Sequence, residues 1–388
     1  TVPEIINQPK DSTICEGENA SFTVNATGTN ITYKWRVKTG AAPFTDVTDG
    51  GIYTNATTGT LNLTGVPYSM NNSIFVVIVS GDCGSPVYSN YVILRVNRPP
   101  AVFTQPKDAS VCDGSGPVYF FSNGTGMIDS LRWQVSTDNG GTWNYIYDDA
   151  MYSGTTSQQL ALIDVPISYH NYQYRLALKA FCANTYSNGA VLTVNSLPSI
   201  SWASDPLPAC GNVTLPIVTT ITGGSGSWTQ HTWTGDVGPL NNYFVQNPNF
   251  KSLLGGTYKL YYKVRDTNGC YGEDSVSVVV DAPDATFTQD INMGCTPATV
   301  NFGIPDITGI TGWTWDFGDG SPVNTTDQNV THIFTNATSS TILYRTVRLT
   351  VTSASGCTDS KTSMMTVYPA VDATFTASDD TVCSGSQL

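Results

Sequence analysis

Charged residues are scarce in this sequence, at 12% of its 388 residues, which is about half the share usual in globular proteins. Its 17 Lys and Arg residues are outnumbered by 30 Asp and Glu residues, and the net charge is −13. A chain with this balance repels the backbone of nucleic acids and anionic membrane surfaces. The composition therefore predicts that neither is a partner.

Long apolar runs are missing as well. The longest one, residues 74–79, has six residues, whereas a membrane-spanning helix needs roughly 20. The chain opens on TVPEIINQPK, which has neither the basic region nor the apolar region of a signal peptide, so we expect any such peptide to lie upstream or to have been removed. The sequence thus predicts no membrane insertion.

Helical periodicity is also absent, because no segment of 12 or more residues repeats apolar positions at a spacing of 3.6. Alternating β-branched runs occur instead at residues 91–97, 190–195, 275–281 and 364–368, and prolines follow each of them. Such alternation is typical of half-buried strands. The fold class predicted is all-β.

What the sequence does contain is a repeat. QPKDSTICEG at 8–17 recurs as QPKDASVCDG at 105–114. The nine cysteines follow the repeat as early cysteines (Cys15, Cys112, Cys210, Cys295 and Cys383) and late cysteines (Cys83, Cys182, Cys270 and Cys357). A tryptophan follows each of the first four early cysteines by 20 to 23 residues, and we expect these to be core residues: Trp35, Trp133, Trp233 and Trp315.

These repeats divide the chain into β-sandwich modules on a rod. The predicted modules span residues 1–98, 99–196, 197–283 and 284–370, and residues 371–388 are expected to begin a further module. The three histidines, His170, His231 and His332, fall in different modules, so their spacing suggests no Ser-His-Asp set. The cysteines never form the C-x-x-C pairs of zinc sites. We therefore predict that the segment is not an enzyme.

The repeated motifs resemble known families. Modules 1 and 2, with the openings CEG and CDG and a mid-module tryptophan, resemble bacterial immunoglobulin-like domains. Module 4, with WTWDFGDG at 313–320 and YRTVRLTVTSASGC at 344–357, is similar to polycystic-kidney-disease (PKD) domains, and module 3 resembles both groups. Strings of such modules are similar to the large surface proteins of Bacteroidetes, which include SprB-type gliding-motility adhesins exported by the type IX secretion system.

This resemblance implies a non-enzymatic repeat segment of an adhesin or surface fibre at the bacterial cell surface, with neighbouring modules of the same chain as its first partners. It also implies O-glycosylation at Asp-Ser and Asp-Thr motifs, which here would modify Ser12, Ser130, Ser275 and Thr381. Spacer modules of a secreted hydrolase and a structural sheath or filament subunit are the alternatives. Surface glycans and other surface proteins are further possible partners, and Tyr145 and Tyr147 are candidates for stacking on sugars.

WDFGDG at 315–320 allows two interpretations. In one, Asp316 and Asp319 contribute oxygens to a calcium site, which is the only cofactor that the sequence suggests. In the other, Gly318 and Gly320 supply positive φ angles, the aspartates cap local backbone amides, and Trp315 enters the core. A kinase interpretation of DFG fails, because the Gly-rich loop, strand lysine and HRD loop are missing.

Regular cysteines in an exported chain predict disulfides, and two pairing schemes are open. The first scheme closes each module on itself: Cys15 with Cys83, Cys112 with Cys182, Cys210 with Cys270, and Cys295 with Cys357. In the Greek key that the resemblance implies, however, the early and late cysteines lie at opposite ends of a module, about 20 Å apart, whereas a disulfide needs Cα atoms within about 7 Å.

The second scheme joins neighbouring modules that stack head to tail. It pairs Cys15 with Cys182, Cys112 with Cys270, and Cys210 with Cys357, and it leaves Cys83, Cys295 and Cys383 for partners outside this chain. Such bonds would stiffen each joint of a stalk.

Overall fold

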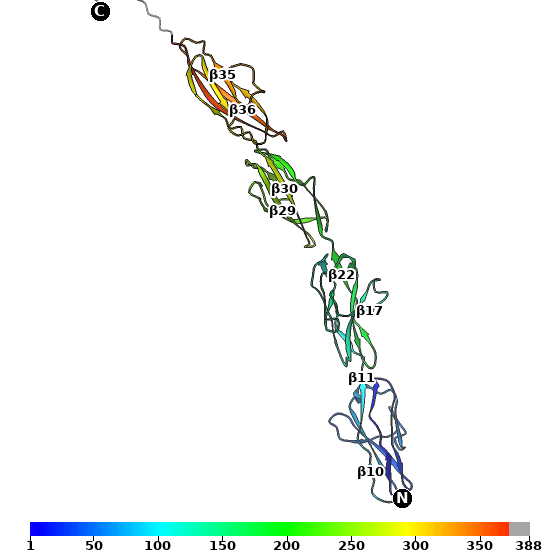
Figure 1. Cartoon of the computed structure of the whole chain (residues 1–388). Coiled ribbons are helices and arrows are strands. Elements are labelled where there is room, and N and C mark those ends of the chain that lie inside the picture. Colours follow the sequence, from blue (N-terminus) through cyan, green and yellow to red (C-terminus); the bar gives the residue numbers. More distant parts are fainter. Residues whose placement is uncertain (372–388) are drawn as a thin grey trace, which may run out of the picture. The chain divides into compact units, whose positions relative to one another are not determined.

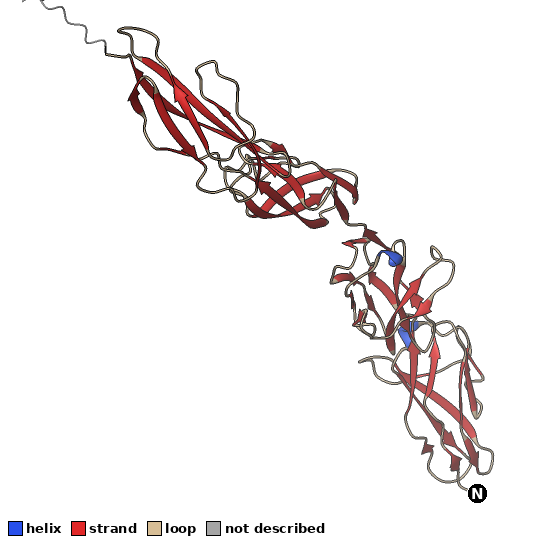
Figure 2. Cartoon of the chain, turned by 45° about the horizontal axis from the view of Figure 1, so that its top comes forward, coloured by secondary structure: helices blue, strands red, loops and turns tan. Residues whose placement is uncertain are grey.

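The computed structural model describes residues 1–371, and these contain β-strands and two short 3-10 turns, η1 (Tyr68–Met70) and η2 (Ile167–Tyr169) (Figure 2). In this part of the chain no helix has the length and apolar character needed to cross a membrane. The residues form two compact units, Thr1–Ser196 and a second that begins at Leu197, and each unit contains two sandwiches in succession (Figure 1). The predicted all-β fold is confirmed.

The first module of the first unit contains two main sheets, with the strand orders β2-β11-β9-β5-β6 and β3-β8-β7, while β10 pairs with β9 and β1 pairs with β4. Its core surrounds Trp35, Phe22 and Phe75. The strands are β1 (Glu4–Asn7), β2 (Ser12–Cys15), β3 (Ala20–Thr23), β4 (Asn25–Thr27), β5 (Thr32–Lys38), β6 (Thr45–Asp46), β7 (Tyr53–Thr54), β8 (Thr60–Leu63), β9 (Ser73–Ser80), β10 (Val87–Tyr88) and β11 (Val92–Asn97).

The second module repeats this arrangement strand for strand. Its main sheets have the orders β13-β22-β20-β16-β17 and β14-β19-β18, while β21 pairs with β20 and β12 pairs with β15. The strands are β12 (Ala101–Thr104), β13 (Ala109–Cys112), β14 (Val118–Phe121), β15 (Asn123–Thr125), β16 (Ser130–Ser136), β17 (Asn144–Tyr145), β18 (Tyr152–Ser153), β19 (Gln159–Leu162), β20 (Gln173–Lys179), β21 (Thr185–Tyr186) and β22 (Ala190–Asn195).

The third module, in the second unit, is built around the sheet β24-β30-β29-β27, with the pairs β23-β26 and β25-β28 beside it. Two strands of 11 residues each, β29 and β30, form its central hairpin. The strands are β23 (Pro198–Trp202), β24 (Leu207–Cys210), β25 (Leu215–Pro216), β26 (Thr219–Gly223), β27 (Trp228–Gly235), β28 (Asn249–Phe250), β29 (Gly256–Asp266) and β30 (Tyr271–Asp281).

The fourth module has two sheets, β32-β37-β36-β34 and β31-β33-β35. Its long hairpin, β36 and β37, matches the β29-β30 hairpin of the third module in length. The strands are β31 (Thr288–Gln289), β32 (Met293–Cys295), β33 (Ala298–Gly303), β34 (Ile310–Asp316), β35 (Val330–Phe334), β36 (Leu343–Ser353) and β37 (Thr358–Tyr368).

The alternating runs form the last strand of each module, because one face of each run is apolar and packs on the core. In β11 the sequence VILRVN buries Val92, Leu94 and Val96 and turns the residues between them outward. This strand pairs in parallel with β2, an arrangement that the sequence does not reveal.

The parallel pairing sets the position of every early cysteine among the described residues. Each lies opposite the last residue of its module's final strand, where the linker to the next module begins. The four register pairs are Cys15 with Asn97, Cys112 with Asn195, Cys210 with Asp281, and Cys295 with Tyr368. The early cysteines therefore lie at the end of the module from which the chain continues to the next linker.

All four predicted core tryptophans are buried, with at most 2% of their surface exposed. Each indole N–H donates a hydrogen bond to a backbone carbonyl of a loop in the same module, so the polar group of the buried ring is satisfied. The four pairs are Trp35 with Thr58 O, Trp133 with Ser157 O, Trp233 with Val245 O, and Trp315 with Asp327 O, at 2.9 to 3.2 Å.

Candidate functional site at the module joints

A disulfide joins the two modules of the first unit. Cys15 ends β2 of the first module, Cys182 lies in the loop between β20 and β21 of the second module, and their Cα atoms are 5.5 Å apart. This distance is within the usual range for disulfides. The bond matches the second of the two predicted pairing schemes.

The linker at this joint is held by both modules. The Arg98 guanidinium donates to both carboxylate oxygens of Glu16, at 2.6 and 2.8 Å, and lies 4.2 Å from the centre of the Tyr68 ring. On the other side of the linker, the Thr185 hydroxyl donates to the Pro100 carbonyl at 2.7 Å. The Arg98–Glu16 pair is solvent-exposed and contributes little stability, so we assign it an orienting role beside the disulfide.

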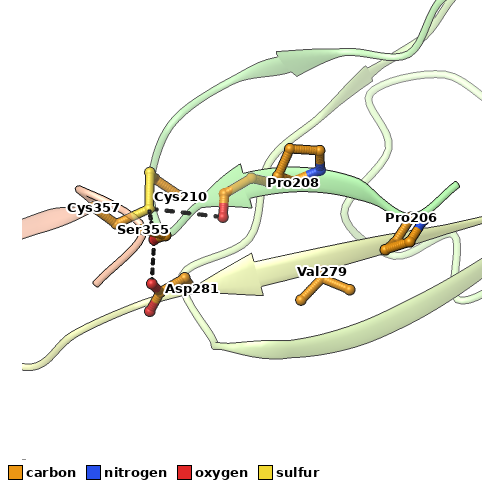
Figure 3. A pocket seen from close by; sticks show the side chains of 8 residues that line it. Pro206, Pro208, Cys210, Val279, Asp281, Ser355 and Cys357 are labelled. Atoms are coloured by element: carbon orange, nitrogen blue, oxygen red, sulfur yellow. Dashed lines mark hydrogen bonds between the residues drawn. A yellow bond between two sulfur atoms is a disulfide. The ribbon is translucent and has the colours of Figure 1, made fainter. Parts of the chain in front are cut away.

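A second disulfide joins the third and fourth modules. Cys210 ends β24, Cys357 lies in the tight turn between β36 and β37, and their Cα atoms are 5.4 Å apart. Figure 3 shows this bond beside Asp281, the last residue of β30. The Asp281 carboxylate accepts a hydrogen bond from Ser353 Oγ at 2.6 Å and another from Ser355 Oγ.

An open pocket of about 530 Å³ lies beside the disulfide of this joint. Most of its wall comes from the third module and is apolar, while the disulfide and the Asp281 carboxylate close one side (Figure 3). The lining residues are Pro206, Pro208, Ala209, Cys210, Val279, Asp281, Ser355 and Cys357. The pocket therefore borders the joint between the third and fourth modules.

The scheme of disulfides within modules is wrong. Its four pairs each include a cysteine that is bonded elsewhere, since Cys15 is joined to Cys182 and Cys210 to Cys357. The physical reason is distance along the module. Cys15 lies beside Asn97 at the end of the first module, whereas the loop of Cys83 packs near Val2 at the start of it.

The remaining cysteines have different states. Cys112 and Cys270 are both disulfide-bonded, and the pairing of one with the other stays a prediction. Cys83 and Cys295 are free and exposed, and they occupy a late and an early position of the repeat. Cys383 lies outside the described residues.

The turn WDFGDG matches the capping interpretation. Asp316 Oδ1 accepts the Gly318 amide at 3.0 Å, and Asp319 Oδ1 accepts the amide and the hydroxyl of Ser321 at 3.0 and 2.6 Å. Gly318 has a φ of 70°, and a Cβ atom at this position would lie 2.3 Å from the Thr346 carbonyl oxygen, so only glycine fits here.

The second oxygen of Asp319 is also engaged. Asp319 Oδ2 lies 2.7 Å from His332 Nε2, and the His332 ring stacks on Phe317 with 3.9 Å between centroids. In residues 1–371 no group of three or more His, Cys, Asp or Glu side chains is placed to hold a metal ion. The contacts therefore account for both aspartates as parts of the turn, and a calcium ion at this site stays a prediction.

Replacing Asp319 by asparagine is expected to destabilise the fourth module by about 2 kcal/mol at neutral pH. Partial burial raises the pKa of Asp319, but hydrogen bonds from Ser321 and His332 outweigh burial and lower the pKa to about 2. A lowered pKa stabilises the fold above the unfolded value near 4, and this contribution is lost as the pH falls through 2.

Urea unfolding of the wild type and the Asp319→Asn variant, followed by tryptophan fluorescence at pH 6 and pH 2, measures the difference. The difference in free energy of unfolding between the two proteins should be much smaller at pH 2 than at pH 6. Asp316→Asn is the matched control, because it makes the same change of a carboxylate to an amide in the same turn, where the side chain accepts a single backbone amide, and it should cost less. A loss for Asp319→Asn that is equal at both pH values would contradict this assignment.

Sequence reasoning missed the polar residues of the joints. Asp281, Ser353 and Ser355 gave no signal as single residues. Comparison of the modules does contain one clue, because S-A-S-G-C at 353–357 repeats D-T-N-G-C at 266–270. In both turns the first side chain accepts the amide of the late cysteine, through Ser353 Oγ at 3.2 Å and Asp266 Oδ1 at 2.8 Å.

The predicted modification sites fall on strands. Ser12 begins β2, Ser130 begins β16, and Ser275 lies within β30. Thr381 lies outside the described residues. Their O-glycosylation stays a prediction.

Family models match two parts of the chain. The PKD domain model covers residues 280–367, which include most of the fourth module. A domain of unknown function, DUF8696, covers residues 103–196, which include most of the second module. No curated protein matches the sequence significantly.

Among solved structures, a three-immunoglobulin-domain fragment of titin is similar at 14% identity and a TM-score of 0.47, over 73% of this chain and 99% of that fragment. The four N-terminal immunoglobulin domains of Dscam1 isoform 4.44 match at 12% identity and a TM-score of 0.32, over 95% of this chain and 100% of theirs. The sheet topology and the PKD match identify the chain as an all-β protein of several tandem immunoglobulin-like and PKD β-sandwich domains.

Proposed function

We propose that this chain is a non-enzymatic stalk segment of an extracellular bacterial adhesin or surface fibre, in which disulfides stiffen the joints between modules. The observation that carries the proposal is the pair of intermodule disulfides, Cys15–Cys182 and Cys210–Cys357. Disulfides persist in oxidising surroundings, which supports a location outside the cytosol. A role in gliding motility is part of the same proposal and rests on the resemblance of the repeats.

The three histidines support a structural role. Each has a contact within its own module: His170 Nδ1 accepts the Val194 amide at 3.2 Å, His231 Nδ1 lies 2.6 Å from the Tyr262 hydroxyl, and His332 contacts Asp319. These contacts are typical of packing and turn residues. They favour a mechanical function over a catalytic one.

The connectivity of the disulfides limits how far the stalk can extend under tension. When the two ends of the chain are pulled apart, tension passes from Cys15 directly to Cys182 and from Cys210 directly to Cys357. The intervening segments, with sequence separations of 167 and 147 residues, are then outside the path of the load. Extended chain measures about 3.5 Å per residue, so the two bonds withhold about 600 Å and about 500 Å of extension.

Single-molecule force spectroscopy on the whole chain, held at its two ends, tests this function. The oxidised chain should show a final extension about 1,100 Å shorter than that of the chain in reductant. A variant with Cys15, Cys112, Cys210 and Cys270 all replaced by serine should extend like the reduced chain. Cys83→Ser, which alters a free cysteine, should behave like the wild type. Equal extension of oxidised and reduced wild type would exclude a disulfide-stiffened stalk.

A further inference from the structure

The outer face of one sheet in the second module gathers aromatic and cationic side chains. Trp133 on β16 and Leu176 on β20 point into the core, so period-two alternation turns Arg132, Arg175 and Lys179 outward. Register brings tyrosines to the same face from the neighbouring strands, since Tyr145 lies opposite Gln134 and Tyr186 lies opposite Ala177. The set, here called the cation–aromatic face, comprises Arg132, Trp143, Tyr145, Tyr147, Arg175, Lys179 and Tyr186.

Every cation of this face is placed over a ring. The Arg132 guanidinium lies 4.4 Å from the centre of Tyr147, and Lys179 Nζ lies 4.9 Å from the centre of Tyr145. Arg175 is held between Trp143 and Tyr186, at 4.2 and 4.3 Å. Stacking fixes a guanidinium but leaves N–H donors in its plane for an incoming anion.

The loop that presents Trp143 is itself held in place. Asp138 accepts hydrogen bonds from the Ser136 hydroxyl and from the amide and hydroxyl of Thr142, at 2.7 to 2.8 Å. The Trp143 indole donates to the Gly140 carbonyl at 3.0 Å. The ring is therefore positioned before any partner arrives, which reduces the entropic cost of binding.

The positive charges of the face have no carboxylate partner. Among residues 1–371, no Asp or Glu forms an ion pair with Arg132, Arg175 or Lys179. The pKa of Asp148 is lowered mainly by the Thr155 amide, which donates to its carboxylate at 2.8 Å, and to a smaller extent by the charge of Arg132. Three cations without a salt-bridge partner thus share one face in a chain with a net charge of −13.

On the equivalent face of the first module, a carboxylate neutralises the cations. There Asp46 pairs with Lys34 at 2.6 Å and with Arg36 at 3.0 Å. Asp46 lies opposite Arg36 in the sheet, as Tyr145 lies opposite Gln134 in the second module. The second module thus has an aromatic residue where the first has the neutralising acid.

A pocket of about 570 Å³ adjoins the face. Arg132 and Lys179 both line it, together with Asp129, Thr156 and the start of β16. Tyr147, which covers Arg132, keeps 64% of its surface exposed. Hydroxyl, carboxylate and cationic groups therefore converge beside exposed aromatic surface.

We infer that the cation–aromatic face binds an acidic polysaccharide. The cations match the carboxylates of uronic-acid units, and the tyrosine hydroxyls and the pocket offer hydrogen bonds to sugar hydroxyls. Nucleic acid fits less well, because base stacking needs free ring faces and here a cation covers one face of each ring. This inference is independent of the stalk function, since it concerns a surface of one module.

Binding of oligogalacturonate to the whole oxidised chain, measured by isothermal titration calorimetry at low salt, tests the inference. Fully methyl-esterified oligogalacturonate has the same backbone without the charges and should not bind. Lys179→Gln and Arg132→Gln should each weaken binding at least tenfold, and a Tyr145→Ala and Tyr147→Ala double variant should do the same. Lys34→Gln removes one positive charge from the equivalent face of the first module and should leave binding unchanged.

Three results would overturn the inference: no binding of oligogalacturonate by the wild type, equal weakening by Lys34→Gln and Lys179→Gln, or tighter binding of single-stranded DNA than of oligogalacturonate. Lys179 is exposed at the end of β20, so Lys179→Gln is expected to fold even if Arg132→Gln does not. Far-ultraviolet circular dichroism of each variant separates lost binding from lost structure.

Discussion

Replacing Cys210 and Cys357 together by serine is expected to lower the stability of the third and fourth modules by up to about 5 kcal/mol. The bond closes a loop with a sequence separation of 147 residues, and cross-linking a loop of this size restricts the unfolded chain strongly in the entropic description. The figure is an upper limit, because each module keeps its own core when the bond is removed.

The more telling effect is on cooperativity. With the disulfide in place, an unfolded module stays covalently tethered to its neighbour. We therefore expect the two modules to unfold together over a narrow range of urea concentration. The serine variant should unfold in two separable steps at lower urea concentrations. Cys295→Ser is the matched control, since it alters a free, exposed cysteine of the same unit. If the control and the double variant had equal midpoints, the disulfide would contribute nothing to stability.

The hydrogen bonds of Asp281 add a smaller, noncovalent part to this joint. Asp281→Ala leaves the disulfide intact but removes the acceptor for Ser353 and Ser355. It belongs in the same series of variants, because it shows how much of the joint unfolding of the two modules persists when the disulfide is kept and the Asp281 hydrogen bonds are lost.

Truncating Trp315 to alanine is expected to lower the free energy of unfolding of the fourth module by about 4 kcal/mol. This is a large share of the stability of a single module, so most of the module should be unfolded close to the wild-type melting temperature. The ring is fully buried, and it packs edge-on against Phe287 and beside Phe302, with centroid distances of 5.2 and 5.7 Å. Its removal leaves a large cavity and an unpaired Asp327 carbonyl.

Differential scanning calorimetry of the whole chain measures this loss as a downward shift of one transition. Tyr344→Ala is the matched control, because Tyr344 lies on β36 of the same module with 64% of its surface exposed, and it should shift the transition little. Trp315→Phe should fall between the two. If Trp315→Ala left the transition temperature unchanged, the assignment of Trp315 to the core of the fourth module would be wrong.

Several parts of this architecture were accessible from the sequence because they depend on local pattern. Alternation in VILRVN and AVLTVN identifies the last strands of the first two modules, since a strand with one buried face must place apolar residues at every second position. The tryptophans were accessible because they recur at a constant offset from the early cysteines. The turn at WDFGDG was accessible through the conformational demands of its glycines.

The joints were less accessible, because they depend on residues that are distant in sequence. Two disulfide schemes fitted the spacing of the cysteines equally well. The parallel pairing of β2 with β11, and of β24 with β30, places each early cysteine at the far end of its module. Arg98 with Glu16, and Asp281 with Ser353, meet for the same reason, across 82 and 72 positions of the chain.

The sequence by itself determined the all-β class, the modular repeat, the core tryptophans and the resemblance to immunoglobulin-like and PKD domains, because each is expressed in short-range periodicity or in motifs that recur. Only the tertiary structure decided between the disulfide schemes, revealed the Asp281 contacts and assembled the cation–aromatic face of the second module. These features depend on which strands pair and in what register, and the free energy that sets the register is distributed over long-range contacts that no single segment displays.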